Sequence, residues 1–491
     1  MEILIKVTVL MFLIHIAEAG QKKNKQVLGP ELCKEELSAA INKFGIDMYM
    51  ELSASHPGEN VFFSPISITT ALSMLMLGAK GETKSQMEEV LYTTELQRCL
   101  HETYNFWEKN LYGGEDGPVL ESANKLYTDQ TLDANRRFVK DIAKYYDASV
   151  QKLDFKDHSD ASRNTINDWV SDQTSQMIQN VLEKGSIDQN TVMVLINAIY
   201  FKGNWLNQFD ISDTSVESFT TETGKVVNVN MMYQEDLFNH YYDNDLKAQF
   251  LELPYEVGTK NSVDIRMVII LPEGKDGILE LQEKLTAEML SKALDELQYW
   301  PTPTYLHVPR FEFKEKYPLH SILEAMGMDE LFSASVNLDG FSTDPRVDVS
   351  TVVHEAAVVI NENGTEASAV TVIGGGRSGY IPDPATVKCD RPFLFLIREV
   401  KEEVSGWAMK TIPGPILFFG KVSEPVEAKD AICNAEDLNN CRDMCRLNCF
   451  EANKRLTNKS RKKNCPTWVG LFEKYRNCKT DCRKDKCVQN C

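Results

Sequence analysis

The sequence predicts a mixed α+β domain followed by a small, disulfide-rich C-terminal tail. Helical patterns come mainly in the first part of the chain and strand-like patterns in the second, without regular alternation of strand and helix. The cysteines are distributed unevenly along the chain, because nine of the twelve follow residue 426. The 491 residues suffice to bury a large core. We therefore expect one large domain with a separate tail.

Apolar residues three or four positions apart predict the helices. A first helix over 34–54 has this spacing, and a second over 66–77 is closed by Gly78. Further helices are expected near 102–111, 135–146, 162–182, 276–297 and 317–327.

Short apolar runs rich in β-branched and aromatic residues predict the strands. Residues 60–65 have the pattern of a short strand that enters a turn. The other predicted strands span 192–200, 248–253, 263–271, 305–313, 356–360, 393–397 and 416–422.

Residues 1–19 have the pattern of a secretory signal peptide. Residues 3–16 are nearly all apolar, and Ala17-Glu18-Ala19 gives a small-x-small cleavage pattern before Gly20. A membrane anchor is the alternative, but the apolar run is short and ends at that pattern. No later segment has about 18 continuous apolar residues. We therefore expect a secreted, extracellular protein with no membrane partner.

Residues 427–491 differ from residues 20–426 in charge and in cysteine content. From Val426 to Cys491 the net charge is +6, whereas the rest of the chain carries −25. In a secreted chain, closely spaced cysteines predict disulfides that stabilise a unit too small to bury a core. Zinc is less favoured because the tail has no histidine. The tail cysteines are Cys433, Cys441, Cys445, Cys449, Cys465, Cys478, Cys482, Cys487 and Cys491.

The segment Glu362–Ser378 combines the properties of a strand and a loop. Residues 365–373 are strand-like, and one face of such a strand carries no charge. The segment then continues into three glycines and Arg377, which a central strand would not contain. This pattern suggests a segment that can enter a sheet from an exposed position.

Motifs along the chain resemble the serpin family from about Glu31 to Pro425. The matching segments are Asn60-Val-Phe-Phe-Ser-Pro-Ile-Ser67, Leu77-Gly-Ala-Lys-Gly81, Asn197-Ala-Ile-Tyr-Phe-Lys-Gly-Asn-Trp205, Glu252-Leu-Pro-Tyr255, His307-Val-Pro-Arg310, His354-Glu-Ala, Asn363-Gly-Thr-Glu-Ala367, Cys389-Asp-Arg-Pro-Phe393 and Pro415-Ile-Leu-Phe-Phe-Gly420. The resemblance implies three β-sheets, about nine helices and an exposed reactive loop. In the family, a serine protease cuts this loop and forms an acyl-enzyme. The loop then enters the main sheet and carries the protease to the far pole.

The resemblance assigns the hinge of the loop to seven residues. Inhibitory serpins have small residues at the entering positions, whereas bulky or charged ones mark non-inhibitory members. This chain has small residues there, so we expect a suicide-type inhibitor of trypsin-like serine proteases; a non-inhibitory binding or carrier protein is the alternative. The hinge residues are Glu362, Gly364, Thr365, Glu366, Ala367, Ser368 and Ala369.

The bait bond is expected between Arg377 and Ser378. An arginine can form a charge-assisted pair with the acidic residue of a trypsin-like pocket. The commonest family loop length, counted from Gly364, instead places the cut after Ser378. That cut would suit an elastase-like protease.

The resemblance also assigns residues that control sheet opening. Ser64, Ser67, Asn197 and His354 match positions that hydrogen-bond beneath the opening sheet. Trp205, Arg310 and Glu362 match positions near the point of first insertion, where Arg310 and Glu362 are expected to form an ion pair. No Ser/His/Asp set points to an enzyme, and we expect no cofactor, metal or nucleic-acid partner.

Several residues are candidates for covalent modification or further contacts. Asn363 and Asn458 lie in glycosylation sequons. A Cys33–Cys99 disulfide is expected, which leaves Cys389 either to pair with the tail or to stay a buried thiol. Basic residues within 454–463 have two interpretations: a binding surface for a glycosaminoglycan or an acidic protein, or simply the solvated face of a small disulfide-stabilised module. Residues 399–414 are longer than the usual family hairpin at this place.

Overall fold

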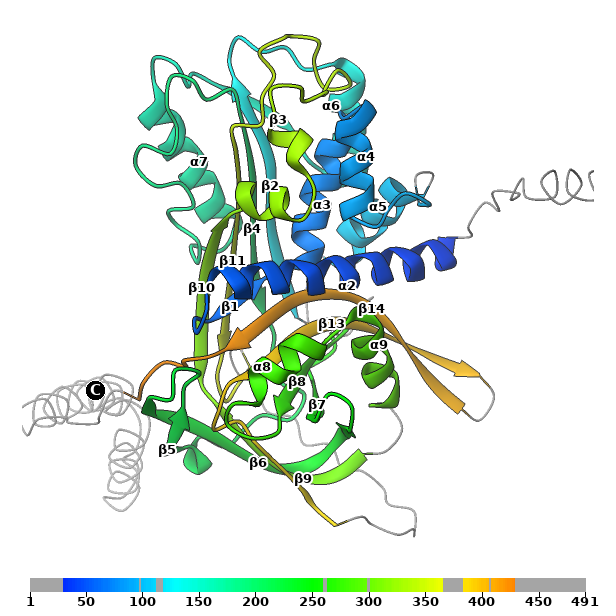
Figure 1. Ribbon diagram of the computed structural model, residues 1–491, viewed down its shortest axis with the longest axis vertical. Helices are drawn as coiled ribbons and strands as arrows, with labels where there is room; N and C mark the ends of the chain where they lie inside the picture. The colour runs from blue at the N-terminus through cyan, green and yellow to red at the C-terminus, as the bar shows by residue number, and fades with distance from the viewer. Residues whose placement is uncertain are drawn as a thin grey trace, which may run out of the picture. The chain divides into compact units, whose positions relative to one another are not determined.

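The computed structural model describes residues 30–96, 99–111, 118–258, 263–297, 301–364, 383–405 and 408–428. Within 402–413 it describes the backbone alone. The chain divides into two compact units, Met1–Val426 and Glu427–Cys491. Nearly all of the described residues belong to the first unit, shown in Figure 1.

The described residues form nine α-helices and two short 3-10 helices. The α-helices are α2 (Pro30–Ser55), α3 (Pro65–Met76), α4 (Gly81–Val90), α5 (Leu100–Asn110), α6 (Arg136–Tyr146), α7 (Ser159–Gln173), α8 (Gly277–Lys284), α9 (Ala287–Glu296) and α10 (His320–Ala325). The 3-10 helices are η1 (Ile211–Asp213) and η2 (Asp329–Phe332).

The strands of the first unit form two hydrogen-bonded sheets. The smaller sheet has the order β10 (Phe311–Pro318), β11 (Thr351–Ile360), β4 (Met193–Lys202), β2 (Val119–Asp129) and β3 (Val150–Leu153). The larger has the order β1 (Val61–Phe63), β14 (Ala408–Val422), β13 (Phe393–Ser405), β8 (Asp264–Pro272), β7 (Ala248–Pro254), β6 (Val226–Asp243), β9 (Pro301–Pro309) and β12 (Ala385–Lys388). Strand β5 (Ser215–Thr220) pairs with β6 outside this order.

Two of the three expected sheets are continuous in this structure. The long strand β6 pairs with β5 and β9 in its first part and with β7 in its last part. It thereby belongs to both sheets and joins them into the larger one. The predicted α+β class is confirmed, and the difference lies only in how the strands are grouped.

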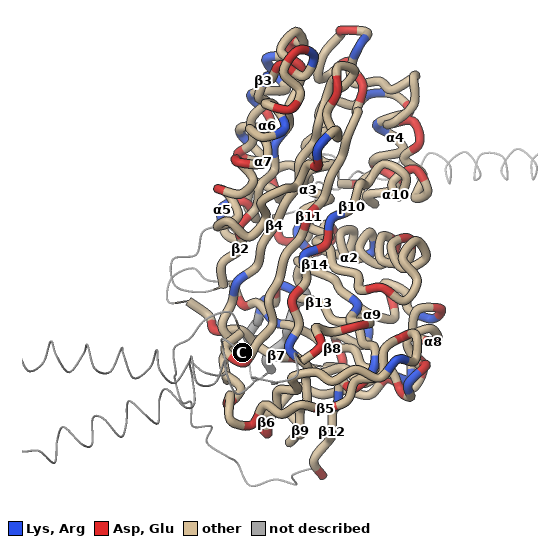
Figure 2. Tube along the Cα trace, turned by 90° about the vertical axis from the view of Figure 1, so that its left-hand side faces the viewer, with Lys and Arg blue, Asp and Glu red and all other residues tan. Residues whose placement is uncertain are grey.

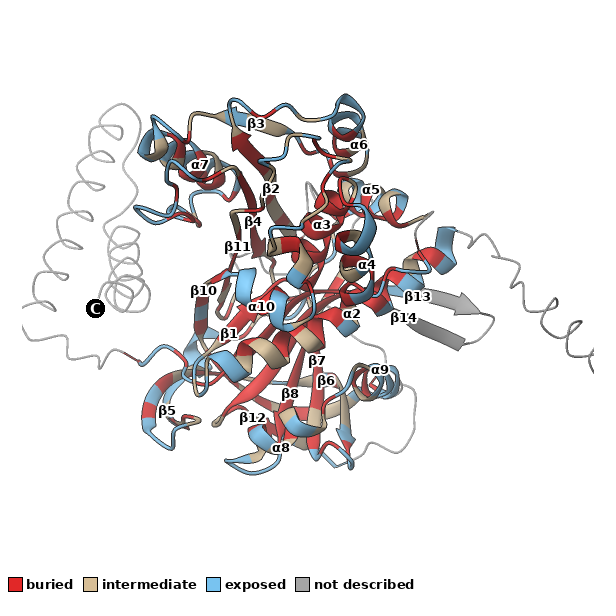
Figure 3. Cartoon of the chain, turned by 45° about the horizontal axis from the view of Figure 1, so that its top comes forward, coloured by how far each residue is buried: buried red, intermediate tan, exposed pale blue. Residues whose placement is uncertain are grey.

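Helix α3 lies at the centre of the core. Ser64 caps it by accepting a hydrogen bond from the Ser67 N–H, and Pro65 stands at the start, where its missing N–H is not needed. All residues of α3 are buried, as an apolar helix between two layers requires. Figure 3 shows the same burial in β7 and β8, whereas the outer faces of the surrounding helices are exposed.

Helix α7 covers the other face of the five-stranded sheet. Its Ile166 and Val170 pack with Tyr127 of β2 and Ala357 of β11 in a second apolar cluster. The central strands β4 and β11 are therefore buried on both faces, and their sequences are nearly continuous apolar runs. Many of the charged residues lie on the surrounding helices and loops (Figure 2).

Many of the predicted elements have different limits in the structure, and three of these differences have a local explanation. The predicted strand 305–313 is two strands with different partners, since β9 pairs with β6 and β10 pairs with β11, and Arg310 lies between them. The predicted helix 276–297 is two helices, and Thr286 caps the second by accepting from the Met289 N–H. The predicted helix 162–182 ends at Gln173, just before two residues with left-handed φ angles, Ser175 and Gln176.

Residues 399–414 lengthen the hairpin between the last two strands. β13 continues to Ser405 and β14 begins at Ala408, and the two pair from Val400↔Pro413 to Ser405↔Ala408. The extra residues therefore extend an existing pair of strands rather than adding a new element.

Candidate functional site at the seam between β4 and β11

The site lies along the boundary between β4 and β11, which we call the seam. These two strands are parallel and pair directly over Thr351–Val358 and Val194–Phe201. A parallel pair far apart in sequence has no hairpin connection, so a third strand could enter between them without breaking the chain. The residues expected to control sheet opening lie along this seam.

The middle of the seam is crossed by hydrogen bonds between side chains. His354 of β11 and Asn197 of β4 are direct neighbours in register, and His354 Nδ1 lies 2.5 Å from Asn197 Oδ1. The Asn197 amide donates to Ser67 Oγ at 2.6 Å. Ser64 donates its N–H to His354 Nε2 at 3.0 Å and its hydroxyl to the Leu417 carbonyl at 2.5 Å. The structure thus brings Ser64, Ser67, Asn197 and His354 into one network.

These contacts determine the protonation state of His354. Nε2 must accept from the Ser64 N–H, so the proton is on Nδ1, where it is donated to Asn197. Burial without a charged partner lowers the pKa of His354 to about 3. The imidazole is therefore neutral at physiological pH.

Asn124 of β2 extends the network and was not anticipated from the sequence. It is the register partner of Asn197, and its Oδ1 accepts from the Asn197 amide. Recognising β2 as a neighbour of β4 would have identified it.

Trp205 lies at the end of the seam next to residues 361–364 and forms hydrogen bonds with them. Its backbone N–H donates to the Asn363 carbonyl at 3.2 Å, and its indole N–H donates to the Asn361 carbonyl at 2.9 Å. The indole stacks on Tyr255, with ring centres 4.4 Å apart. Both rings are buried, so Trp205 gives the hinge a rigid support.

Glu362 is fixed by an ion pair and a hydroxyl. Arg310 donates from Nε to Glu362 Oε1 at 2.6 Å, as the resemblance implies, and Thr214 donates its hydroxyl to the same oxygen at 2.5 Å. The carboxylate is buried, while Arg310 stays partly exposed. Thr214 and Asn361 were not anticipated, because no local pattern distinguishes them. Tyr255 lies in one of the matching segments, but no contact with Trp205 was expected of it.

Gly364 ends the described part of the hinge in a tight turn. Its N–H donates to the Asn361 carbonyl at 3.1 Å, and its φ of +87° lies in the left-handed region. A Cβ at this position would lie 2.5 Å from the Gly203 carbonyl oxygen and 2.7 Å from Asn204 Cα. Only glycine fits this turn without a shift of the backbone.

Glu355 places a carboxyl group next to the seam, on the face opposite to His354. It is buried, and its nearest cation is Lys314, whose Nζ lies 3.9 Å from Oε1. Burial raises the pKa of Glu355, although Lys314 and Lys316 act in the opposite direction. Glu362 differs from Glu355, because Arg310 lies in direct hydrogen-bond contact with the carboxylate of Glu362.

Several predicted site residues lie outside the described part of the chain. These are Thr365, Glu366, Ala367, Ser368, Ala369, Arg377, Ser378, Asn458 and the nine tail cysteines. Residues 1–19 also lie outside it. Asn363 is partly buried within the hinge turn.

The cysteines of the first unit differ in state. Cys33 and Cys99 form a disulfide with a Cα–Cα distance of 6.4 Å, which joins α2 to the start of α5. Cys389 is a free thiol and fully buried, which corresponds to the second of its two expected states. Burial raises the pKa of this thiol far above its usual range.

The described residues contain neither a metal-binding cluster nor a membrane-spanning helix. Among them, no group of three or more His, Cys, Asp or Glu residues could hold a metal ion. No described helix has the length and apolar character that crossing a membrane requires.

Comparisons with known proteins agree with this architecture. The sequence model of the family Serpin (serine protease inhibitor) matches residues 39–425. Human serpin B3 is 34% identical over 404 residues, which cover 79% of this chain and 99% of the relative. Leukocyte elastase inhibitor of Bos taurus is 33% identical over 402 residues, covering 80% of this chain and 100% of the relative.

Solved structures give the same result. Uncleaved ovalbumin superposes with a TM-score of 0.69 at 30% identity, covering 79% of this chain and 100% of ovalbumin. Human thyroxine-binding globulin complexed with thyroxine superposes with a TM-score of 0.68 at 27% identity. The match covers 80% of this chain and 100% of the globulin chain.

These relatives contradict the expected localisation. Serpins B3, B4 and B11 and leukocyte elastase inhibitor are intracellular serpins of clade B, which points away from secretion. The prediction of a secreted, extracellular protein is therefore wrong. It rested on the apolar composition and cleavage pattern of the first residues, which a segment with another role can share.

The family model and the relatives match most of the chain, and the seam with its polar network fits the same architecture. The chain therefore belongs to the serpin family.

Proposed function

We propose that this serpin inhibits trypsin-like serine proteases, with Arg377–Ser378 as the bait bond. The observation that most supports inhibition is the closed seam, whereas the proposed specificity rests on Arg377 in the sequence. β4 and β11 pair directly, and the hinge is attached to Trp205 at one end of the boundary between them. In this state the sheet can still accept one strand. An inhibitor must keep this place in the sheet available until its loop is cut.

The loop sequence has the length and character that insertion needs. From Thr365 to Arg377 there are about 13 residues, or roughly 43 Å of extended chain at ~3.3 Å per residue. The entering positions Thr365, Ala367 and Ala369 are small and uncharged. New backbone hydrogen bonds and buried side chains would drive insertion, so the uncut protein is held kinetically.

A second candidate target is an elastase-like protease, with the cut after Ser378. The matches to leukocyte elastase inhibitor favour this candidate. A non-inhibitory binding role is a third, because the matched thyroxine-binding globulin is complexed with thyroxine. The three proposals differ in the covalent product that they predict.

The deciding experiment is incubation with trypsin, a thrombin-like protease and elastase, followed by denaturing gels and mass spectrometry. We expect a covalent complex with a trypsin-like enzyme and release of a fragment that begins at Ser378. A protease whose catalytic serine is replaced by alanine gives no complex and serves as the control. Cleavage without a complex and without a gain in heat stability would contradict inhibition.

Two loop variants separate the alternative cuts. R377A should abolish the trypsin-type complex, because the charge that binds the acidic pocket is lost. If elastase instead cuts after Ser378, the released fragment begins at Gly379. S378E should then abolish the complex with elastase, because the small pocket of that protease rejects a charged side chain. A trypsin-type complex that persists in R377A excludes Arg377 as the bait residue.

We further propose that the basic tail binds an acidic polymer or protein surface. The basic residues within 454–463 and the net charge of +6 support this, since the rest of the chain is strongly acidic. Heparin is a suitable probe of such a surface.

A further inference from the structure

At the end of the seam remote from the hinge, a serine hydroxyl joins the starts of the two strands. The Val192 N–H, directly before β4, donates to Ser350 Oγ at 3.0 Å. Ser350, directly before β11, donates its hydroxyl to Asp348 Oδ2 at 3.1 Å. We call Val192, Asp348 and Ser350 the distal clasp. It joins the starts of the two strands that form the seam.

Both sides of the distal clasp are held by further contacts. On the β4 side, the Val192 carbonyl accepts from the Asp129 N–H at 2.9 Å. On the β11 side, Arg346 forms two hydrogen bonds to Asp344, from Nε at 3.0 Å and Nη2 at 2.7 Å, and donates from Nη1 to Thr131 Oγ1 at 3.0 Å.

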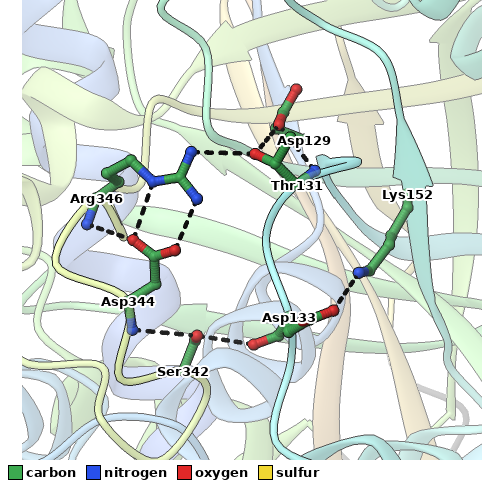
Figure 4. Close-up of polar contacts among 7 residues, drawn as sticks. All are labelled: Asp129, Thr131, Asp133, Lys152, Ser342, Asp344 and Arg346. Atoms are coloured by element: carbon green, nitrogen blue, oxygen red, sulfur yellow. Dashed lines mark hydrogen bonds and ion pairs between the residues drawn. The ribbon is translucent and has the colours of Figure 1, made fainter.

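Figure 4 shows the wider network around these contacts. Ser342 donates its hydroxyl to the Asp133 carbonyl at 2.7 Å, and Lys152 pairs with Asp133. The segment that leads into β11 is thereby tied to the turn that follows β2. That turn lies on the β4 side of the seam, so these contacts also oppose separation of the two strands.

Entry of a strand into the seam is incompatible with the distal clasp. Neighbouring strands lie about 4.8 Å apart, so one added strand moves β11 away from β4 by about that distance. A hydrogen bond of 3.0 Å between Val192 and Ser350 cannot span the widened gap. The distal clasp must therefore break before insertion is complete.

The position of the distal clasp makes it a late barrier. An antiparallel strand beside β11 that continues from the Asn361–Gly364 bridge needs about eleven residues to reach Ser350. About thirteen residues, 365–377, lie between Gly364 and the expected bait bond. The entering strand would reach Trp205 early and His354 about halfway through insertion. It would reach Ser350 only when the loop is nearly fully inserted.

We propose that Ser350 is a positioning residue that sets how readily the loop completes its insertion. The inference rests on the proposed inhibitory function and deepens it. The acyl-enzyme has two fates at this stage. Insertion traps the ester, or water attacks its carbonyl and leaves a free carboxyl group on the loop and a regenerated protease serine. A stronger distal clasp delays trapping and so favours hydrolysis.

The test compares three variants of the full chain. S350A removes the acceptor for the Val192 N–H, S350T retains a hydroxyl there, and T191V is the matched control. Thr191 is the residue next to Val192, and its hydroxyl bonds to Asp188 within a local turn, away from the seam.

Two readouts distinguish positioning from a general loss of stability. We expect S350A to speed hydrogen exchange of the amides at the start of β4 about 3- to 10-fold, as loss of one hydrogen bond implies. We also expect S350A to lower the number of inhibitor molecules cut for each protease trapped, with an unchanged rate of initial cleavage. S350T and T191V should behave as the wild type in both.

The outcomes separate this inference from the function on which it rests. If the wild type forms no covalent complex, the proposed inhibition fails and the role of Ser350 in trapping fails with it. If the wild type traps the protease but S350A leaves the stoichiometry unchanged, the proposal for Ser350 alone is overturned. The same holds if T191V changes the stoichiometry as much as S350A does.

Discussion

His354 shows how a single residue makes the seam sensitive to pH. Its neutral ring donates to Asn197 and accepts from Ser64, so a second proton on Nε2 would face the Ser64 N–H. The pKa of His354 is about 3 in the folded protein, against an ordinary value of 6.5. The folded state therefore binds fewer protons than the unfolded state between these values. The stability that His354 contributes is complete above pH 6.5 and is lost as the pH falls toward 3.

We expect this loss to be measurable as a difference between two proteins. The free energy of unfolding of the wild type, relative to H354Q, should fall by up to about 1.4 kcal/mol per pH unit below pH 6.5. Urea unfolding between about pH 7.5 and about pH 5.5 measures it. Using the difference removes the effect of Glu315, whose pKa is raised to about 7 by burial and whose contribution falls as the pH rises. A difference that does not change with pH would show that His354 titrates normally.

Gly364 tests the support of the hinge. G364A should lower the free energy of unfolding by about 1–3 kcal/mol, because the new Cβ meets Gly203 and Asn204 at a left-handed φ angle. Thermal and urea unfolding measure this loss. G224A is the matched control, since Gly224 has a φ of +81° but an added Cβ there would have no heavy atom within 4 Å. Equal losses in both variants would mean that backbone strain alone is responsible.

At this scale the sequence identified the residues that belong to motifs but not their partners. Ser64, Asn197, His354, Trp205, Arg310 and Glu362 form hydrogen bonds or an ion pair in the structure, and their control of sheet opening stays a prediction. Asn124 and Thr214 were missed because each meets its partner through pairing of distant segments. Ser350 was missed for the same reason, since a serine before a strand has no local signature.

Among the elements, helices were easier to predict than strands. The helix at 34–54 was identified from its own periodicity, and the structure extends it to Pro30–Ser55. Strands β2 and β6 were missed because their alternation is irregular, and their burial depends on neighbours far along the chain. The segment 305–313 appeared as one strand because local composition carries no information on which sheet each half joins.

The disulfide between Cys33 and Cys99 fixes two elements relative to each other. It closes a loop over a sequence separation of 66 residues, which restricts the unfolded chain. Reduction should therefore lower the free energy of unfolding by about 2–4 kcal/mol. Urea unfolding with and without reductant measures the difference. The double variant C33A/C99A should be insensitive to the reductant. If its stability still changes on reduction, another disulfide is responsible.

At the scale of the whole molecule, the two units should be separable. The described core of the first unit includes its last strand β14, which ends at Val422 and in which Phe419 packs on Tyr49 of α2. A chain that ends after residue 428 should therefore fold with an unchanged unfolding temperature and an unchanged stoichiometry of protease trapping. Both quantities are measured beside the full chain.

The same truncation should abolish retention on heparin. Residues 1–425 carry a net charge of −25, so we expect the first unit to repel a sulfated polymer and the basic tail to attract it. The full chain should elute at a salt concentration that falls when lysines within 459–463 are replaced by glutamine, because each removed charge weakens a screened interaction. Replacing three lysines in the first unit, Lys247, Lys284 and Lys292, is the control for net charge. Retention of the truncated chain, or equal effects of both sets of substitutions, would place the acidic partner on the first unit instead of the tail.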